Sequence, residues 1–302
     1  MDKTEIKKIK KLLLVGLFIV SSYGHSQNSF VSDPAKAEFI TSDIASFWQY
    51  FDQIESKKNP FNEYLDNGSK GLNDFIPYRI ESPKHLLKTV KKRKKDYKAI
   101  REDSFKIDLF TDSIRSFYKN FKGLYSDAVF PPTYFVIGAF NSGGTSSDNG
   151  LIIGVEMQNK IQNIPYIVAH ELMHFNQNYP SKNNTLLSQS IKEGSADFIG
   201  ELISGKHINE EAFKYGNENE KLLCTEFVQI MNDSKYHGWL YGSKGKKEGR
   251  PNDLGYWIGY KISESYYYKS DNKKQAIRNI LNVQDFSVFL EKSTYLTEYM
   301  NR

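Results

Sequence analysis

The stretch His170-Glu171-Leu172-Met173-His174, near the middle of this 302-residue chain, constrains its fold and chemistry more than any other. On a helix, His170 and His174 lie one turn apart, so both imidazoles leave the same face. Glu171 lies about 100° round the helix from His170, close enough to hold a water bound to the same ion. One further ligand from elsewhere would leave a coordination position for that water, as in catalytic zinc sites. The stretch therefore predicts one zinc ion in a hydrolytic site.

The residues around this motif indicate a largely buried helix. Pro165 suits the first turn, and apolar residues recur at helical spacing: Ile164, Ile167, Val168, Leu172 and Phe175. Two histidines and a glutamate on such a helix are costly to bury unless they bind a charge. The alternative is that both histidines are satisfied core or surface groups that hold no ion.

A second helix is predicted around Lys192-Glu193-Gly194-Ser195-Ala196-Asp197, where eighteen residues separate His174 from Glu193. Its apolar stripe is formed by Leu187, Ile191, Phe198 and Leu202. Glu193 and Asp197 lie four residues apart on a different strip, where two carboxylates repel by roughly 0.2–0.5 kcal/mol. A cation and a metal-bound imidazole would reverse the sign of this interaction.

Glu193 is therefore the predicted third ligand, and Asp197 the predicted acceptor that orients an N–H group of a ligand histidine. The small residues Gly194 and Ala196 would let this helix approach the helix of the histidines closely. The alternative for the two carboxylates is the solvated acidic edge of an ordinary surface helix.

The complete pattern resembles the gluzincin zinc peptidases: HExxH, eighteen intervening residues, then Glu-Gly-x-Ala-Asp at 193–197. Within that clan it is most similar to the compact bacterial family of predicted zinc-dependent proteases, with a fainter likeness to the gliding-motility lipoprotein B group. The likeness spans roughly residues 130–265 and includes Phe140-Asn141-Ser142-Gly143-Gly144 and Gly255-Tyr256-Trp257-Ile258-Gly259-Tyr260.

The resemblance implies a zincin-like catalytic core in which His170, His174 and Glu193 bind zinc and Glu171 is the catalytic base. Two features depart from the large zinc aminopeptidases of the same clan. This chain is far shorter, and Gly154-Val155-Glu156-Met157-Gln158 only echoes their Gly-x-Met-Glu-Asn exopeptidase motif, with the acid one place early. Exopeptidase specificity therefore does not transfer from the resemblance.

The N-terminus has the pattern of a secretory signal peptide. Lys7 to Lys11 form a basic region, and Leu12 to Val20 form an apolar core too short to span a bilayer comfortably. Gly24 and Ser26 offer small residues for cleavage, so residues 1–26 are predicted to be removed. We expect export to the periplasm or the medium, with no membrane span after cleavage. An uncleaved anchor is the alternative, and no lipid anchor is expected because no cysteine lies near the cut.

Composition and charge limit the partners of the mature chain. Cys224 is the single cysteine, which excludes an intramolecular disulfide and a cysteine-rich metal site. Loss of residues 1–26 would remove five lysines together with Asp2 and Glu5, which lowers the net charge from +5 to about +2. This balance gives no reason to expect a nucleic-acid partner. The dense run Lys91 to Lys95 is interpreted as a solvated helix face, with an anionic-surface patch as the alternative.

Two regions are predicted after the signal peptide, and together they form an α+β, mostly helical fold. Residues 27–125 form a helical N-terminal region, and residues 126–302 form the zincin-like metallopeptidase core. Thr133 to Ala139 and Leu151 to Met157 are rich in β-branched and aromatic residues, which favours strands of a small sheet beside the histidine helix.

The glycine-rich segment between these strands, Asn141 to Gly150, has two interpretations. The first is a flexible hairpin connection. The second is a mobile rim beside an edge strand that pairs with an extended substrate, since exposed strand edges bind peptides through main-chain hydrogen bonds. The resemblance implies such an edge strand, and Leu151 to Glu156 is the better candidate for it.

Hydrolysis also needs a hydrogen-bond donor for the oxyanion that forms when water attacks the carbonyl. The resemblance implies a tyrosine or histidine from the region after the third ligand. Four residues there are candidates, and we favour the first: Tyr256, Tyr260, Tyr241 and His237.

The sequence therefore favours an exported zinc metallopeptidase that acts on peptide or protein substrates. The alternative is a non-catalytic accessory or binding protein of the cell envelope that retains the zinc fold, as the likeness to gliding lipoproteins allows. Glu171 counts against that alternative, because metal binding alone does not require this residue.

Overall fold

The computed structural model describes residues 30–158, 160–182 and 184–300, so the predicted signal peptide lies outside the described residues. The strands are β1 (Phe39–Ile40), β2 (Thr133–Val136), β3 (Gly144–Ser147) and β4 (Gly150–Gly154). The α-helices are α1 (Ser42–Phe51), α2 (Phe61–Asp66), α3 (Lys70–Phe75), α4 (Pro83–Lys92), α5 (Lys94–Ser104), α6 (Thr111–Leu124), α7 (Ile164–Asn176), α8 (Leu186–Ser204), α9 (Glu210–Glu218), α10 (Glu220–Ile230), α11 (Leu254–Lys269), α12 (Lys273–Leu281), α13 (Phe286–Ser293) and α14 (Thr297–Met300).

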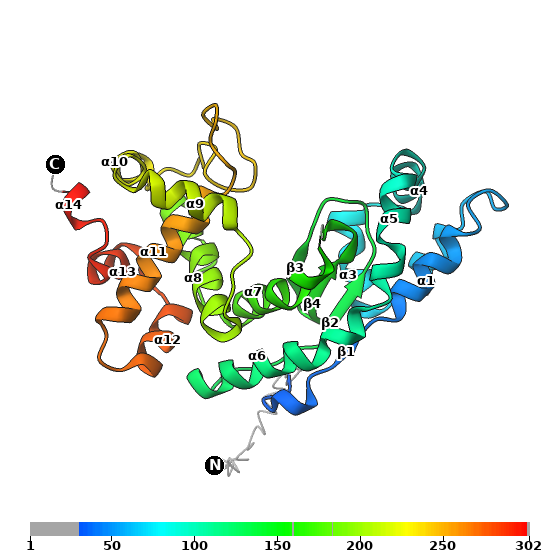
Figure 1. Ribbon diagram of the computed structural model, residues 1–302, viewed down its shortest axis with the longest axis horizontal. Coiled ribbons are helices and arrows are strands. Elements are labelled where there is room, and N and C mark those ends of the chain that lie inside the picture. Colours follow the sequence, from blue (N-terminus) through cyan, green and yellow to red (C-terminus); the bar gives the residue numbers. More distant parts are fainter. Residues whose placement is uncertain (1–29, 159, 183, 301–302) are drawn as a thin grey trace, which may run out of the picture.

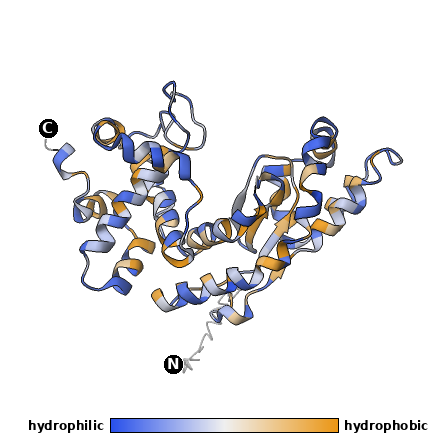
Figure 2. Ribbon diagram, viewed as in Figure 1, coloured by the Kyte–Doolittle hydropathy of each residue, from blue (hydrophilic) through white to orange (hydrophobic). Residues whose placement is uncertain are grey.

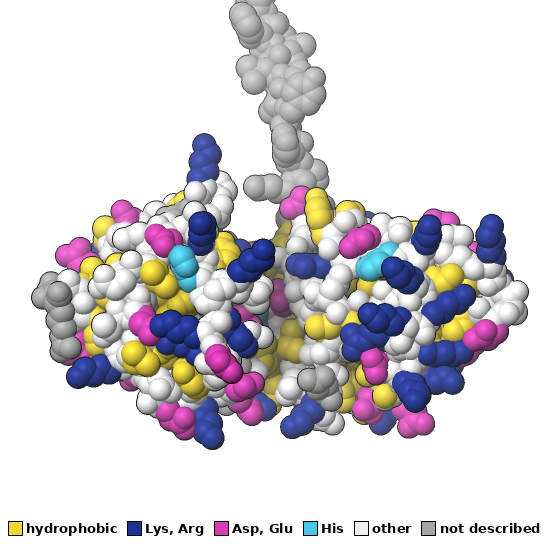
Figure 3. Space-filling model, turned by 90° about the horizontal axis from the view of Figure 1, so that it is seen from above, with side chains coloured by type: hydrophobic (Ala, Val, Ile, Leu, Met, Phe, Trp, Pro, Cys, Tyr) yellow, Lys and Arg dark blue, Asp and Glu magenta, His cyan; other side chains and the backbone are white. Residues whose placement is uncertain are grey.

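The prediction of a mostly helical α+β fold is confirmed. The sheet and helices α1 to α5 form one half of the molecule, helices α8 to α14 form the other, and α7 runs between them (Figure 1). Figure 3 shows a groove between these halves on the face seen there. No helix in the described part of the chain is both long and apolar enough to span a membrane. The boundary between residues 125 and 126 stays a prediction.

The sheet has the strand order β1-β2-β4-β3. β1 and β4 pair with β2 in parallel, with Thr133 opposite both Phe39 and Leu151. β3 pairs with β4 in an antiparallel ladder. Among the described residues of the predicted helical region 27–125, β1 is the one strand, and it joins that region to the core by pairing with β2. Every residue of β2 and β4 is buried, as expected for central strands covered on both faces.

The edge strand beside the histidine helix is β3, which corrects the prediction that Leu151 to Glu156 would form this edge. β4 is occupied on both sides by β2 and β3, and the expected connection Asn141 to Gly150 itself supplies β3. Gly150 makes the tight turn possible, because its φ is +146° and a Cβ there would lie 2.2 Å from the Pro132 carbonyl oxygen. β3 was not predicted as a strand because its residues, Gly-Thr-Ser-Ser, lack the large β-branched and aromatic side chains that favour strands.

Helix α7 is apolar on most of its surface, and it packs on the sheet at β3 and β4 and on α6 and α8 (Figures 1 and 2). Pro165 lies in its first turn, as predicted, where no backbone N–H is needed. Ile164, Val168 and Leu172 are fully buried, so the apolar stripe holds the helix in place and fixes the direction of its histidines.

Helix α8 packs most closely against α11, through a contact between glycines. A Cβ on Gly194 would lie 2.1 Å from the backbone nitrogen of Tyr260 and 2.5 Å from the Cα of Gly259. The prediction that Gly194 lets α8 approach the histidine helix is therefore wrong. That contact belongs to Gly200, whose Cβ position lies 3.6 Å from the backbone nitrogen of His170.

Two surface features also bear on the predictions. Leu202 is 37% exposed and does not belong to the buried stripe of α8, whereas Ile199 and Ile203 are buried. The basic run Lys91 to Lys95 spans the junction of α4 and α5, and most of its lysines are exposed, as expected for a solvated surface.

Candidate metal centre

Helices α7 and α8 bring three acceptor atoms to one point. The Nε2 atoms of His170 and His174 lie 3.0 Å apart. The Oε2 atom of Glu193 lies 3.0 Å from Nε2 of His174 and 3.5 Å from Nε2 of His170. Among the described residues these are the three side chains whose ligand atoms could hold a metal ion together. The sequence-predicted ligands thus converge.

The outward-facing nitrogen of each imidazole has its own acceptor. Nδ1 of His170 lies 2.7 Å from Oδ1 of Asp197, which is 2% exposed. Nδ1 of His174 lies 2.9 Å from Oε1 of Gln177, at the end of α7. Asp197 accepts a further hydrogen bond from Asn209. The structure therefore puts Asp197 against a ligand histidine, where the sequence predicted it, and adds Gln177, which the sequence analysis missed.

These contacts decide what the cluster can bind. Because Asp197 and Gln177 accept hydrogen bonds from the Nδ1 atoms, each Nδ1 carries the proton and each Nε2 presents a lone pair. Unless a proton bridges them, two imidazole lone pairs and a carboxylate oxygen then face one another. A cation resolves this repulsion, and two nitrogens with one carboxylate oxygen form the donor set of catalytic zinc sites. The residues present fit a zinc ion.

Burial and charge act against each other on these groups. Burial alone would lower the pKa of His170, but the carboxylates of Asp197 and Glu193 outweigh it and raise that pKa well above its usual value. Burial alone would raise the pKa of Glu193, but the imidazoles of His174 and His170 hold it well below its usual range. The cluster therefore keeps Glu193 ionised and attracts positive charge.

Glu171 lies at the mouth of the cluster. It is 9% exposed, and its carboxyl group forms no hydrogen bond or ion pair with the part of the chain that the structure describes. Burial raises its pKa, while the charges of His174, His170 and Lys192 oppose this effect. A Cβ on Gly144 of β3 would lie 2.4 Å from Oε1 of Glu171, so a larger residue where the edge strand passes this carboxyl group would displace the Glu171 side chain.

Two of the four candidate oxyanion donors reach the cluster. The ring of Tyr256 lies parallel to that of His170 at 6.0 Å, and its hydroxyl group has no hydrogen-bond partner among residues 30–158, 160–182 and 184–300. The hydroxyl group of Tyr241 donates to Oε1 of Glu193 at 2.5 Å. Tyr241 lies on the long loop between α10 and α11, with a positive φ of 56°.

The other two candidates lie elsewhere. Tyr260 packs edge-to-face against Phe198 and Phe213. His237 pairs with Asp233 on the surface at 2.8 Å. The structure therefore separates the four candidate donors. Tyr256 and Tyr241 lie beside the three candidate ligands, and Tyr260 and His237 do not.

Comparisons with known proteins agree with this geometry. No curated protein and no solved structure matches the chain. One family model matches residues 136–286, which is half of the chain and includes His170, His174 and Glu193. The chain therefore belongs to the family described as predicted Zn-dependent proteases (DUF2268).

Proposed function

We propose that this protein is an exported zinc metallopeptidase in which Glu171 acts as the general base. One observation carries the proposal: three converging acceptor atoms of His170, His174 and Glu193 lie beside a buried carboxyl group without a partner. A site that only held a structural ion would complete its coordination with a fourth protein ligand. Here Glu171 is not one of the clustered ligands, so a coordination position would remain for a water molecule.

The residues of the site divide the hydrolytic work. Zinc, when bound, would lower the pKa of water and polarise the scissile carbonyl group. Glu171 would take a proton from the water and later pass it to the leaving amine. Its raised pKa, which burial causes, brings it closer to the operating pH and suits a group that both accepts and returns a proton.

The neighbouring side chains would hold the geometry. Asp197 and Gln177 fix the tautomer and the direction of the imidazoles of His170 and His174. Tyr256 would donate its free hydroxyl group to the oxyanion, and removal of such a donor typically slows turnover about 10²–10³-fold. Tyr241 already donates to Glu193, so we assign it a positioning role.

Strand β3 would hold the substrate in an extended form. Its free edge pairs with no other strand in the described ranges, and it passes Glu171 at Gly144. A peptide added to this edge would form main-chain hydrogen bonds along Gly144–Ser147. The scissile bond of such a peptide would then lie next to Glu171. This arrangement fits a peptidase that acts on an extended, unfolded segment, at a chain end or within a chain.

A single substitution tests the proposal. Glu171→Gln removes the base and leaves the three ligands, so the purified protein should retain one zinc ion per chain and lose about 10²–10⁴-fold in peptide hydrolysis. Glu211→Gln, on the exposed face of α9, is the matched control and should change neither quantity. Elemental analysis and a quenched-fluorescent peptide library give the two measurements.

The outcomes are distinct. Full peptidase activity in Glu171→Gln would contradict the proposal. Stoichiometric zinc in the native protein, with no turnover of any peptide in the library, would favour the accessory or binding protein of the cell envelope instead.

Export is a separate part of the proposal and rests on the sequence of residues 1–26. We expect the mature chain to begin near Gln27. N-terminal sequencing of the protein recovered from periplasm or medium tests this expectation, and recovery of the intact Met1 form in the membrane fraction would contradict it.

A further inference from the structure

A polar pocket opens directly beside the metal centre. It has a volume of about 260 Å³ and shares His174 with the cluster. Lys192 of α8, Gln177 and Asn184 also line it. The rings of Tyr179 and Phe286, packed edge-to-face with their centroids 5.4 Å apart, form one apolar wall. The pocket is large enough for a side chain or a chain end of a peptide.

Lys192 is the charged group of this pocket that lacks a partner. Six described lysines are partly buried, and the ammonium groups of five of them are bound. Lys94, Lys206 and Lys261 pair with carboxylates, and Lys122 and Lys273 donate to backbone carbonyl groups: their contacts range from 2.6 to 3.2 Å. The ammonium group of Lys192 has no ion pair or hydrogen bond within the described part of the chain.

The position of Lys192 directs its charge toward the site. It precedes Glu193 on α8, and its carbonyl oxygen accepts a hydrogen bond of 2.8 Å from the side-chain amide of Gln177, at the end of α7. The ammonium group lies near enough to Glu171 for the two charges to interact. A partly buried ammonium group without a partner at the wall of a pocket can pair with an anionic group of a ligand that enters the pocket.

We propose that this pocket is a specificity site in which Lys192 binds a carboxylate of the substrate, next to the bond that is cut. The inference rests on the proposed peptidase function and names its substrate class, which is acidic peptides. A glutamate or aspartate side chain and a free C-terminal carboxylate share this chemistry. The rings of Tyr179 and Phe286 would cover the methylene groups that carry the carboxylate.

The experiment compares matched peptides on the zinc-loaded protein. Each pair differs by Glu against Gln at one position near the cleaved bond, and each peptide is made with a free and with an amidated C-terminus. We expect about a tenfold or larger preference in kcat/KM for the peptide with the carboxylate, mainly through KM, as one charge-assisted hydrogen bond allows. A preference that follows the glutamate identifies a side chain, and one that follows the free terminus identifies the chain end.

Three variants assign the preference to Lys192. Lys192→Gln should abolish the preference and retain zinc, and Lys192→Arg should largely restore it because the charge is kept. Lys206→Gln, near the opposite end of α8 and paired with Glu210, is the control and should keep the full preference. Equal cleavage of acid and amide peptides by the native protein, or an unchanged preference in Lys192→Gln, would overturn the inference.

A binding measurement separates this inference from the proposed function. The zinc-loaded Glu171→Gln protein should bind the acidic peptides more tightly than their amide partners, and addition of Lys192→Gln should remove the difference. Such binding without hydrolysis by the native protein would sustain the pocket and refute the peptidase. Hydrolysis by the native protein without any preference for acidic peptides would support the peptidase and refute the role of the pocket.

Discussion

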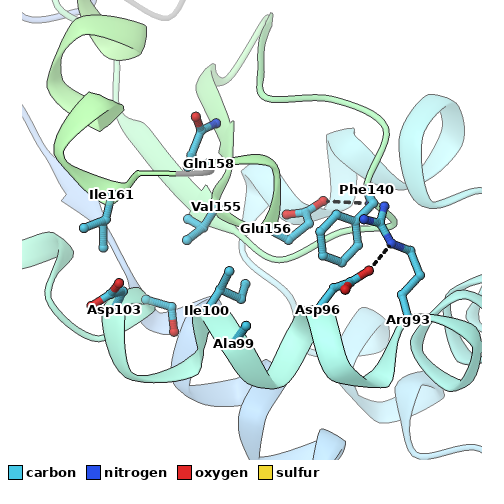
Figure 4. A pocket seen from close by; sticks show the side chains of 11 residues that line it. Arg93, Asp96, Ala99, Ile100, Asp103, Phe140, Val155, Glu156, Gln158 and Ile161 are labelled. Carbon is cyan, nitrogen blue, oxygen red and sulfur yellow. Dashed lines mark hydrogen bonds and ion pairs between the residues drawn. The ribbon is translucent and has the colours of Figure 1, made fainter.

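Glu193 and Glu156 are two buried glutamates with opposite electrostatic states. Glu193 is 6% exposed, and its oxygens contact two imidazoles and the hydroxyl group of Tyr241. Glu156 is 3% exposed and follows β4 in a pocket of about 340 Å³ next to α5 (Figure 4). Its Oε1 accepts from the backbone nitrogen of Phe140, and its Oε2 has no partner within the described ranges.

The comparison shows that partners, and not burial, decide whether such a group is charged. Burial raises the pKa of Glu156 to about 7, and the backbone donors and the more distant Arg93 oppose it only in part. The imidazoles overcome the same burial at Glu193 and lower its pKa. Glu193 is therefore ionised and can bind a cation, whereas Glu156 stays mostly protonated at any pH below about 7. The acid of the segment that only echoes the exopeptidase motif lies outside the metal centre.

The largest effect is expected from neutralising each glutamate in turn. Glu193→Gln removes the anionic ligand and should reduce bound zinc from one ion per chain to almost none, with hydrolysis at background. Glu156→Gln should retain one zinc ion per chain. Elemental analysis after dialysis checks both, and equal zinc content in the two variants would remove the functional distinction between these residues.

The next largest effect concerns the hydroxyl group of Tyr256, whose ring lies beside that of His170. Tyr256→Phe should lower kcat about 10²–10³-fold with zinc retained, because the oxyanion loses its donor. Tyr260→Phe serves as control, since that ring packs against Phe198 and Phe213 away from the cluster. If Tyr256→Phe keeps full activity while Tyr241→Phe loses it, the donor role belongs to Tyr241.

A smaller effect is expected from the support behind His170. Asp197→Asn replaces the charged acceptor that orients this imidazole, and it should weaken zinc binding about 10–100-fold. Competition with a chelator of known affinity measures the change, and circular dichroism checks that the fold is kept. Zinc affinity equal to that of the native protein would show that the three ligands, with Gln177 behind His174, suffice to hold the site.

The smallest effect is a pH-dependent change in stability at Glu156. Its folded-state pKa is raised from 4.5 to about 7, so its contribution is fully present below about pH 4.5 and is lost as the pH rises through about 7. Glu156→Gln cannot ionise and should be more stable than the native chain by on the order of 1–2 kcal/mol at pH 8, but not at pH 4.5. Urea unfolding at both values measures this, and a gain of equal size at both would contradict the assigned cause.

Much of the metal centre could be predicted because its spacing is local. His170 and His174 are separated by one helical turn, and Glu193 and Asp197 by another, so two helices in contact suffice to bring them together. Gln177 and Asn209 could not be predicted, because their contacts depend on where a chain leaves its helix. Tyr241 depends on the path of a long loop.

The errors have physical reasons as well. β3 consists of Gly-Thr-Ser-Ser, which carries little strand propensity, and it becomes a strand because it pairs with β4 in an antiparallel ladder. Gly194 allows close packing of α8 against α11 and not against α7. A glycine in a helix indicates that another element packs closely there, but the sequence does not show which element it is. Strand pairing and helix packing of this kind depend on tertiary contacts, so the residues of a single segment do not determine them.

The central claim is that His170, His174 and Glu193 hold one zinc ion beside Glu171. An anomalous difference map from a crystal of the zinc-loaded protein, recorded at the zinc absorption edge, tests it most directly. The account predicts a single strong peak about 2.0–2.2 Å from both Nε2 atoms and from a carboxylate oxygen of Glu193. Absence of a peak there, or a peak that leaves Glu193 uncoordinated, would contradict it.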